Sequence, residues 1–185
     1  METPIQRLDF PNHRNVRLYC KREDLLPFSL GGNKVRIGQA FYADMLAKGK
    51  DCMMVYGNSR SNLCRVLANL CRAHQIPCYM ICSREEGEES GIETNNSRLM
   101  KWLGAEVIPC EKTNIAQTVE DTVNRLTAEG KHPYYIFGDK YGTGNEGPPV
   151  QAYVDGYREI QQWEKQAGVL FSHIFFASGT GSTQC

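Results

Sequence analysis

The sequence predicts an α/β fold, with open, mostly parallel twisted sheets and helices on both faces, in three layers. Two observations predict it. Short apolar runs typical of buried strands alternate along the chain with longer segments whose apolar residues recur at helical spacing. Polar or glycine-containing turns separate these segments. Strands that alternate with helices in this way form right-handed βαβ units, which assemble into parallel sheets.

The expected strands are short runs rich in branched, aromatic and sulfur-containing residues. The first is "VRLYC", and the last is "SHIFFA", which leads into a glycine-rich turn. In chain order the expected strands cover residues 16–20, 52–56, 77–82, 105–110, 134–138 and 172–177.

The expected helices carry apolar stripes and recognisable ends. Ile37, Phe41 and Met45 form one such stripe at helical spacing. Asn114 is the expected N-cap of a later helix, and Pro148 opens the last one, where a missing N–H costs least. In chain order the expected helices cover residues 33–49, 60–75, 94–104, 114–130 and 148–166.

Charge and composition exclude several classes of function. The 21 basic and 21 acidic residues cancel, so no global field favours nucleic acid or an anionic membrane. The apolar runs are too short to cross a bilayer, and "METPIQRLDFPNHR" lacks the apolar core of a secretory signal, so we expect a cytoplasmic protein. The eight cysteines include no C-x-x-C pair and the four histidines are scattered, so we expect reduced, mostly buried thiols and no metal site.

A lysine at the start of an expected helix is the first candidate for chemistry. Lys34 follows two glycines and an asparagine in "SLGGNKVR". The positive end of a helix dipole disfavours an ammonium group, so a lysine there serves stability poorly, whereas a free amine would suit Schiff-base chemistry. The glycines would let the backbone come close to a flat ligand. A solvated surface lysine is the alternative interpretation.

The second candidate is a pair of polar residues after the expected strand 52–56. Ser61 and Asn62 in "YGNSRSNLCR" stand where the strand end enters a helix. Open α/β proteins bind ligands in the crevice outside the carboxyl ends of their strands, and these side chains would point into it. Helix capping, which serine and asparagine both do well, is the alternative.

The turn after the last expected strand could cradle a phosphate. Glycines allow a close backbone approach, and consecutive N–H groups and hydroxyls can bind an anion without arginine or lysine. A flexible turn is the alternative. The residues concerned are Ser178, Gly179, Thr180, Gly181, Ser182 and Thr183.

A third glycine-rich segment, "GTGNEG" at 142–147, fits the G-x-G-x-x-G pattern of dinucleotide-binding proteins. Its context is poor, because "DKY" separates it from the strand and two prolines follow. The region around Glu164, where an acidic strand end should lie, is an expected helix. A nicotinamide-dependent oxidoreductase is therefore kept only as an alternative.

Four stretches occur together in an order that resembles a known family. They are "KREDLLPFSLGGNKVR", "GNSRSN", "NSRLMKWLGAEV" and "SGTGSTQ". In this order they resemble pyridoxal-phosphate enzymes of the tryptophan-synthase-β fold. Within that fold the resemblance is closest to the D-cysteine desulfhydrase and 1-aminocyclopropane-1-carboxylate (ACC) deaminase family, of which the chain resembles the amino-terminal portion.

The resemblance implies roles for the candidate residues. Lys34 would hold pyridoxal 5'-phosphate covalently and later carry protons. Asn62 would hydrogen-bond the ring hydroxyl of the cofactor, and Ser61 would contact the substrate carboxylate or assist proton movement. The segment from Ser178 to Thr183 would bind the phosphate. The chain departs from the usual pattern in three ways. Asn58 and Arg60 replace a glycine and a glutamine, and Leu63 replaces a polar residue, often histidine. The segment "GDKYGTGNEGPPVQAYV", which includes the bulky Tyr141, is longer than the usual loop.

The resemblance also implies an organisation and a reaction. Residues 1–50 would begin a large cofactor domain, 51–150 would form a small α/β domain, and 151–185 would return to the large domain. The expected reaction is α,β-elimination of D-cysteine to pyruvate, ammonia and sulfide, with ACC deamination as the alternative. We expect a small amino acid as substrate and a homodimer, or completion by a carboxyl-terminal half that this chain lacks. A non-catalytic interaction protein that kept the fold is the alternative from another class.

Overall fold

The computed structural model describes residues 2–11, 14, 16–84 and 93–177 of the chain. Its larger sheet is parallel and has four strands in the order β5-β4-β3-β6. Two short strands pair separately as an antiparallel hairpin, β1 (Ile5–Leu8) and β2 (Leu18–Lys21). The central strands are β3 (Cys52–Gly57), β4 (Cys78–Arg84), β5 (Glu106–Glu111) and β6 (Pro133–Tyr135).

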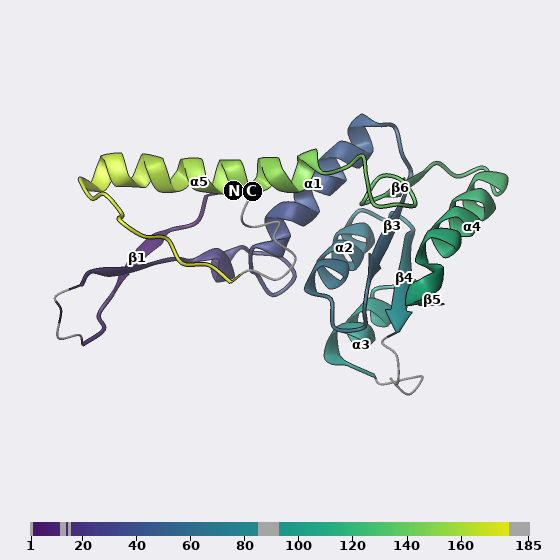
Figure 1. The fold of residues 1–185 in the computed structure, drawn as a ribbon, viewed down its shortest axis with the longest axis horizontal. Helices are drawn as coiled ribbons and strands as arrows, with labels where there is room; N and C mark the ends of the chain where they lie inside the picture. Colours follow the sequence, from purple (N-terminus) through teal and green to yellow (C-terminus); the bar gives the residue numbers. More distant parts are fainter. Residues whose placement is uncertain (1, 12–13, 15, 85–92, 178–185) are drawn as a thin grey trace.

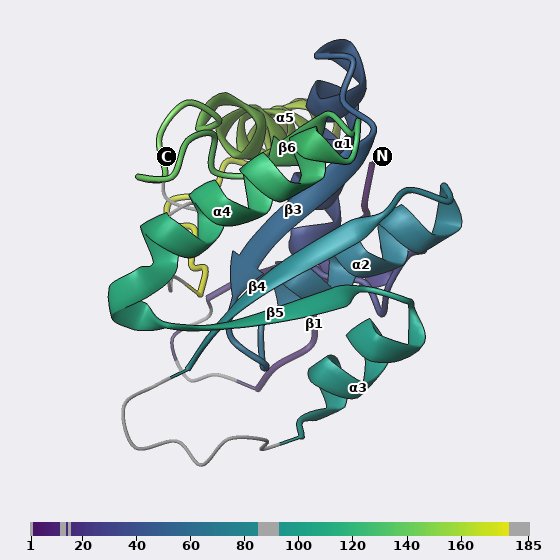
Figure 2. The same cartoon turned by 90° about the vertical axis from the view of Figure 1, so that its right-hand side faces the viewer.

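Helices cover both faces of the central sheet (Figures 1 and 2). One buried cluster joins α1, α2 and α3 to one face, and a second joins α4 to the other. The α-helices are α1 (Lys34–Ala47), α2 (Asn62–Ala73), α3 (Asn95–Trp102), α4 (Ile115–Ala128) and α5 (Gly147–Ala167). Two short 3₁₀ helices, Glu23–Leu25 and Lys112–Asn114, lie between these elements. The predicted three-layer α/β architecture is confirmed.

Alternation along the strands explains the two layers. Successive residues of a strand point to opposite faces, and here Met53 and Val55 pack with the α1–α2–α3 layer, whereas Met54 packs with α4. Because both faces are covered, β3 needs no polar face, and four of its six residues are fully buried. This is why the sequence "CMMV" forms a central strand.

The described cysteines are free, and five of the seven are buried. Burial raises the pKa of the Cys64 thiol, which lies between α2 and the sheet, to about 12. The prediction of reduced, mostly buried thiols is confirmed for the part of the chain that the structure describes. The buried thiols are Cys52, Cys64, Cys71, Cys78 and Cys110.

Two parts of the predicted strand pattern were wrong. The hairpin strand β1 was not predicted, and described residues 172–177 form no strand. A strand needs a neighbour that supplies ladder hydrogen bonds, and no described strand pairs with this segment. The preceding Phe171 packs instead against the rings of Tyr19 and Trp163, with centroids 5.2 and 5.5 Å away. Phe175 remains 88% exposed.

The predicted helices are confirmed, although their ends differ by one or more residues. Asn114 precedes α4 as expected but makes no side-chain capping bond. No helix among the described residues is long and apolar enough to cross a bilayer. The predicted cytoplasmic location and the division at residues 50 and 150 stay predictions.

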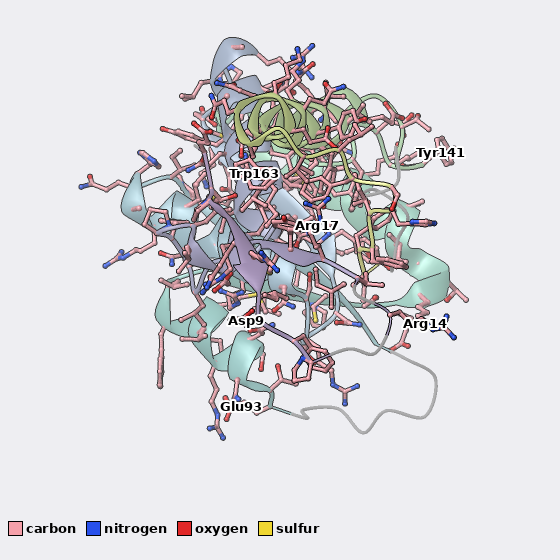
Figure 3. All side chains as sticks on the ribbon, turned by 90° about the vertical axis from the view of Figure 1, so that its left-hand side faces the viewer. Asp9, Arg14, Arg17, Glu93, Tyr141 and Trp163 are labelled. Atoms are coloured by element: carbon pink, nitrogen blue, oxygen red, sulfur yellow. The ribbon has the colours of Figure 1, made fainter. Side chains whose placement is uncertain are left out.

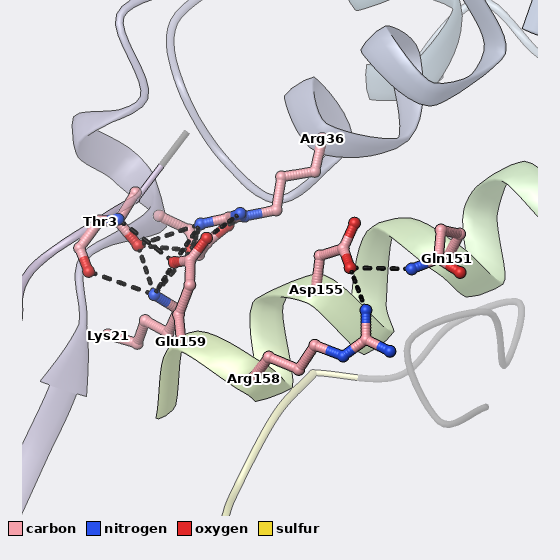
Figure 4. A network of polar contacts seen from close by, with 8 residues as sticks. Thr3, Lys21, Arg36, Gln151, Asp155, Arg158 and Glu159 are labelled. Carbon is pink, nitrogen blue, oxygen red and sulfur yellow. Dashed lines mark hydrogen bonds and ion pairs between the residues drawn. The ribbon is translucent and has the colours of Figure 1, made fainter. Parts of the chain in front are cut away.

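A charged cluster ties α1 to the hairpin and to α5 (Figure 4). Arg36 is its centre: Nε donates to Glu23 at 2.6 Å, and Nη1 donates to Glu159 at 2.7 Å. Lys21 Nζ donates to Glu159 at 2.6 Å and to the Thr3 hydroxyl at 2.7 Å. We call these five residues the Arg36 cluster. Because Arg36 stands two residues after Lys34, the cluster fixes the first turn of α1.

The Arg36 cluster should make stability depend on pH. Burial alone would raise the pKa of Glu23 and of Glu159. Hydrogen bonds from Arg36 and Thr3 to Glu23, and from Arg36 and Lys21 to Glu159, outweigh burial and hold both pKa values below their usual range. Carboxyl groups with lowered pKa values bind protons less readily when folded. Their contribution is therefore complete above the unfolded pKa of about 4.3 and is lost as pH falls through the folded pKa values.

Replacing Arg36 with methionine tests this account. The change leaves two half-buried carboxylates with Lys21 as the remaining cation of the cluster, so we expect a loss of about 3 kcal/mol in the free energy of unfolding at pH 7. The acid dependence between about pH 5 and 3 should become weaker than in the wild type. Urea unfolding at several pH values measures both. Arg158→Met, which removes an exposed ion pair with Asp155 on α5, is the control and should cost less than about 1 kcal/mol. Equal losses in both variants would contradict the buried role of the cluster.

Candidate functional site

The loop before α1 has an unusual backbone. Four successive residues, Ser29 to Gly32, have positive φ angles of 47°, 65°, 69° and 91°. A Cβ atom at Gly31 would lie 2.2 Å from the carbonyl oxygen of Asp24, so only glycine fits there. The Gly32 N–H donates to the Glu23 carbonyl at 2.8 Å. This left-handed turn delivers the chain to the start of α1 at Lys34.

Arg65 of α2 hydrogen-bonds to this loop at Ser29. Its Nη1 donates to the Ser29 hydroxyl at 2.9 Å and to the Ser29 carbonyl oxygen. The residue is 7% exposed, and burial lowers its pKa. Sequence reasoning missed this contact, although an arginine between Cys64 and Val66, inside an otherwise apolar stretch, was the available signal.

Lys34 is the first residue of α1 and is half-buried. Its neighbour Asn33 donates from Nδ2 to the hydroxyl of Tyr153 on α5 at 2.9 Å. Together with Arg36 this bond connects the first turn of α1 to α5. The lysine therefore stands on a braced helix start rather than on a free loop.

The start of α2 is also closely packed. A Cβ atom at Gly57, the last residue of β3, would lie 2.8 Å from Cys64 Sγ and 3.1 Å from Ser61 Oγ. Ser61 is the N-cap of α2, and its Oγ accepts the Cys64 N–H at 3.2 Å. Asn62 is the first residue of the helix, exposed, and its Oδ1 accepts a hydrogen bond from Asn96 at 3.0 Å. Capping, the alternative interpretation of this pair, is thus present at Ser61.

The departures at Asn58 and Leu63 have local explanations. Asn58 Oδ1 accepts the Arg60 N–H at 3.0 Å, which closes a side-chain turn in place of a glycine turn. Leu63 packs, half-buried, against the cluster between the sheet and α2. Both residues therefore stabilise the turn into α2.

The starts of α1 and α2 lie against one another. Val35 and Val66 share a buried cluster with Leu26, and a Cβ atom at Gly38 would lie 2.8 Å from a methyl of Val66. Both helices begin on the side of the molecule toward which β3 and β4 point (Figure 1). The structure therefore brings the helix starts at Lys34 and at Ser61 and Asn62 to one side of the sheet. The remaining predicted residues, Ser178 to Thr183, lie outside the described residues.

The "GTGNEG" loop does not support dinucleotide binding. The Asp139 carboxylate accepts the N–H groups of Tyr141 and Thr143 at 2.8 and 3.0 Å, and Glu146 accepts that of Gly144 at 2.9 Å. Carboxylates of the chain thus occupy N–H groups that a phosphate would need. Prolines without N–H groups also stand in the first turn of α5. Tyr141, which is 76% exposed, projects from the edge of the molecule (Figure 3).

The structure thus has a parallel sheet with polar helix starts at its carboxyl edge, which is where open α/β proteins in general bind their ligands. The family model described as "Pyridoxal-phosphate dependent enzyme" matches residues 1–185, so the chain belongs to this family. Its tryptophan-synthase-β-like fold and its resemblance to the D-cysteine desulfhydrase and ACC deaminase group are confirmed.

The chain is similar to several curated proteins and solved structures. It is 30% identical to a D-cysteine desulfhydrase of Serratia proteamaculans, covering 98% of this chain and 55% of the relative. A Yersinia pestis D-cysteine desulfhydrase is also 30% identical, with 98% and 54% covered. A crystal structure of an ACC deaminase homologue superposes with a TM-score of 0.74 at 28% identity, covering 99% of this chain and 54% of the other. The chain spans about half the length of these relatives.

The described residues fit part of a pyridoxal-phosphate site. Lys34, which is half-buried as a residue, stands at a fixed helix start, and its amine is the nucleophile that covalent attachment of an aldehyde needs. The amide of Asn62 could donate to a ring hydroxyl. The phosphate-binding part of the site falls on residues outside the described ranges.

Proposed function

We propose that this chain forms part of a pyridoxal-phosphate-dependent lyase or deaminase that acts on a small amino acid. The favoured reaction converts D-cysteine and water into pyruvate, ammonia and hydrogen sulfide. The main support is the 30% identity to D-cysteine desulfhydrases across 98% of the chain, which includes the helix start at Lys34. A homodimer, or completion by a carboxyl-terminal half, belongs to the same proposal.

ACC deamination is the second candidate. The similarity to an ACC deaminase homologue at 28% identity and a TM-score of 0.74 favours it. The two reactions need the same first event, which is weakening of a bond at the α-carbon of the substrate. Asn58, Arg60 and Leu63 depart from the usual loop that enters α2, beside the Ser61 that would contact the substrate carboxylate, so a direct comparison of the two substrates decides between the reactions.

Each candidate residue of the chain would have its own role in this reaction. Bound pyridoxal phosphate supplies an electron sink for the bond that breaks. Lys34 would attach the cofactor through its amine and, once displaced, carry the α-proton. Asn62 would donate a hydrogen bond to the ring hydroxyl, and Ser61 would bind the substrate carboxylate or assist proton transfer. Ser178 to Thr183 would bind the phosphate through N–H groups and hydroxyls.

Product analysis tests the proposal. The protein, loaded with pyridoxal phosphate, is incubated separately with D-cysteine and with ACC. Sulfide and pyruvate in equal amounts from D-cysteine would support the desulfhydrase reaction, whereas a four-carbon 2-oxo acid and ammonia from ACC would favour the deaminase. Cofactor attached at Lys34 with neither product would favour the non-catalytic interaction protein.

Two substitutions at Ser61 separate capping from chemistry. Ser61→Ala removes the cap and should cost about 1 kcal/mol of stability. Ser61→Asp retains a capping oxygen, so stability should stay near that of the wild type, but its charge should repel a substrate carboxylate. We therefore expect Ser61→Asp to raise KM by at least about tenfold. Thermal unfolding and steady-state kinetics provide the two measurements, and an unchanged KM in Ser61→Asp would contradict substrate contact at this position.

A further inference from the structure

The start of α3 is bonded to the loop that enters α2. Thr94 donates from its hydroxyl to the Ser59 carbonyl oxygen at 2.6 Å. Asn96 donates from Nδ2 to the Arg60 carbonyl oxygen at 2.8 Å and to Asn62 Oδ1 at 3.0 Å. Three bonds therefore cross from one helix start to the other, across more than 30 residues of sequence.

The first turn of α3 is itself fixed by a capping box. The Ser97 N–H donates to Thr94 Oγ1 at 3.1 Å, and the Thr94 N–H donates to Ser97 Oγ at 2.8 Å. Asn96 lies inside this turn and is half-buried. Its amide is thus presented to Asn62 from a rigid element.

Bonding logic determines which way both amides face. A backbone carbonyl oxygen can only accept, so the Asn96 group that faces Arg60 must be its NH₂. The same NH₂ meets Asn62, so Asn62 must present its oxygen to Asn96. The NH₂ of Asn62 is then directed away from α3. The phenolic oxygen of a pyridoxal ring, when ionised, needs a donor of this kind.

We propose that Asn96 is a positioning residue, which sets the amide orientation of Asn62 so that its NH₂ serves the cofactor's ring hydroxyl. This inference rests on the proposed function, because it assumes that Asn62 faces the cofactor. Asn96 itself touches neither cofactor nor substrate in this scheme. Without it, the Asn62 amide can rotate and present its oxygen, which cannot donate.

The test is a double-mutant cycle read by cofactor binding rather than by activity. The protein in its full native length is titrated with pyridoxal phosphate, followed by near-visible absorption, borohydride reduction and mapping of the peptide that carries Lys34. We expect Asn62→Ala to weaken binding about tenfold and Asn96→Ala about fivefold, typical of one charge-assisted hydrogen bond lost or misdirected. The double variant should be only about tenfold weaker, because both changes remove one interaction.

A cofactor analogue sharpens the test. With 3-deoxypyridoxal phosphate, which lacks the ring hydroxyl, neither substitution should weaken binding. Thr94→Val removes the cap and the bond to Ser59 but leaves the amide pair, so it should lower the melting temperature more than it weakens binding. Asn95→Ala, an exposed neighbour, should change neither.

The outcomes distinguish two kinds of failure. A folded wild-type protein that attaches no cofactor to Lys34 would overturn the proposed function and this inference with it. Attachment in the wild type, with losses that multiply to about fiftyfold in the double variant or that persist with the deoxy analogue, would overturn only the positioning role. Asn96 would then be a structural brace.

Discussion

Replacing Lys34 with alanine is expected to abolish attachment of pyridoxal phosphate and all turnover, without loss of stability. The amine is the nucleophile that the proposed chemistry needs, and alanine offers none. The helix itself should tolerate the change well. A cation at a helix start is unfavourable by about 0.3–1 kcal/mol, so its removal should leave the melting temperature unchanged or slightly higher.

Absorption after addition of the cofactor, peptide mapping after borohydride reduction, and thermal unfolding together check this result. Lys165→Ala is the matched control, because Lys165 is an exposed lysine in the last turn of α5 and should be irrelevant to the cofactor. Cofactor found on another lysine in both the wild type and Lys34→Ala would remove Lys34 from the mechanism. A large fall in stability of Lys34→Ala would mean that the side chain serves the fold instead.

The second large effect is expected at Gly31. Alanine there would place Cβ 2.2 Å from the Asp24 carbonyl oxygen, and its φ of 69° is already unfavourable for any other residue. The backbone atom of Asp24 cannot rotate away as a side chain could. We expect Gly31→Ala to cost at least about 3 kcal/mol in the free energy of unfolding.

Gly32→Ala is the comparison that isolates the clash. Gly32 also has a positive φ, of 91°, but no atom lies within 4 Å of the position that its Cβ would take. It should therefore show the conformational cost alone, about 1–2 kcal/mol. Urea unfolding of both variants gives the difference. Equal losses at the two positions would mean that the loop can shift away from Asp24, and cofactor attachment at Lys34 would then report how far that shift reaches.

Local patterns predicted most of the fold, and non-local pairing accounts for what was missed. The run "CMMV" is continuously apolar and of strand length, and Ile37, Phe41 and Met45 recur at helical spacing, so this strand and this helix were predictable. The strand β1 depends on a partner strand whose paired residues lie 16 positions later for Ile5↔Lys21 and 10 positions later for Leu8↔Leu18, and its own sequence has little alternation. The run "SHIFFA" has the composition of a strand but no described partner, and composition cannot supply hydrogen bonds.

The same distinction applies to the candidate site. Lys34 and Ser61 could be placed at helix starts because glycines, serine and asparagine mark such positions in sequence. The contacts that hold them could not: Arg65 reaches a loop 36 residues away, and Asn96 bonds to a residue 34 positions earlier. These partners depend on how α1, α2 and α3 pack, which a single sequence does not encode in any short window.

The rate at which the buried thiols are chemically modified reports how often the interior of this protein opens. A thiol reagent attacks thiolate, and burial both raises the pKa of Cys64 and Cys52 to about 12 and blocks access to them. Modification must therefore wait until the surrounding layers open. Cys64 lies between α2 and the sheet, whereas Cys110 lies on the side of α4. The modification rate of each thiol measures how often its own helix layer separates from the sheet. The opening of the two faces can therefore be measured independently in one native sample.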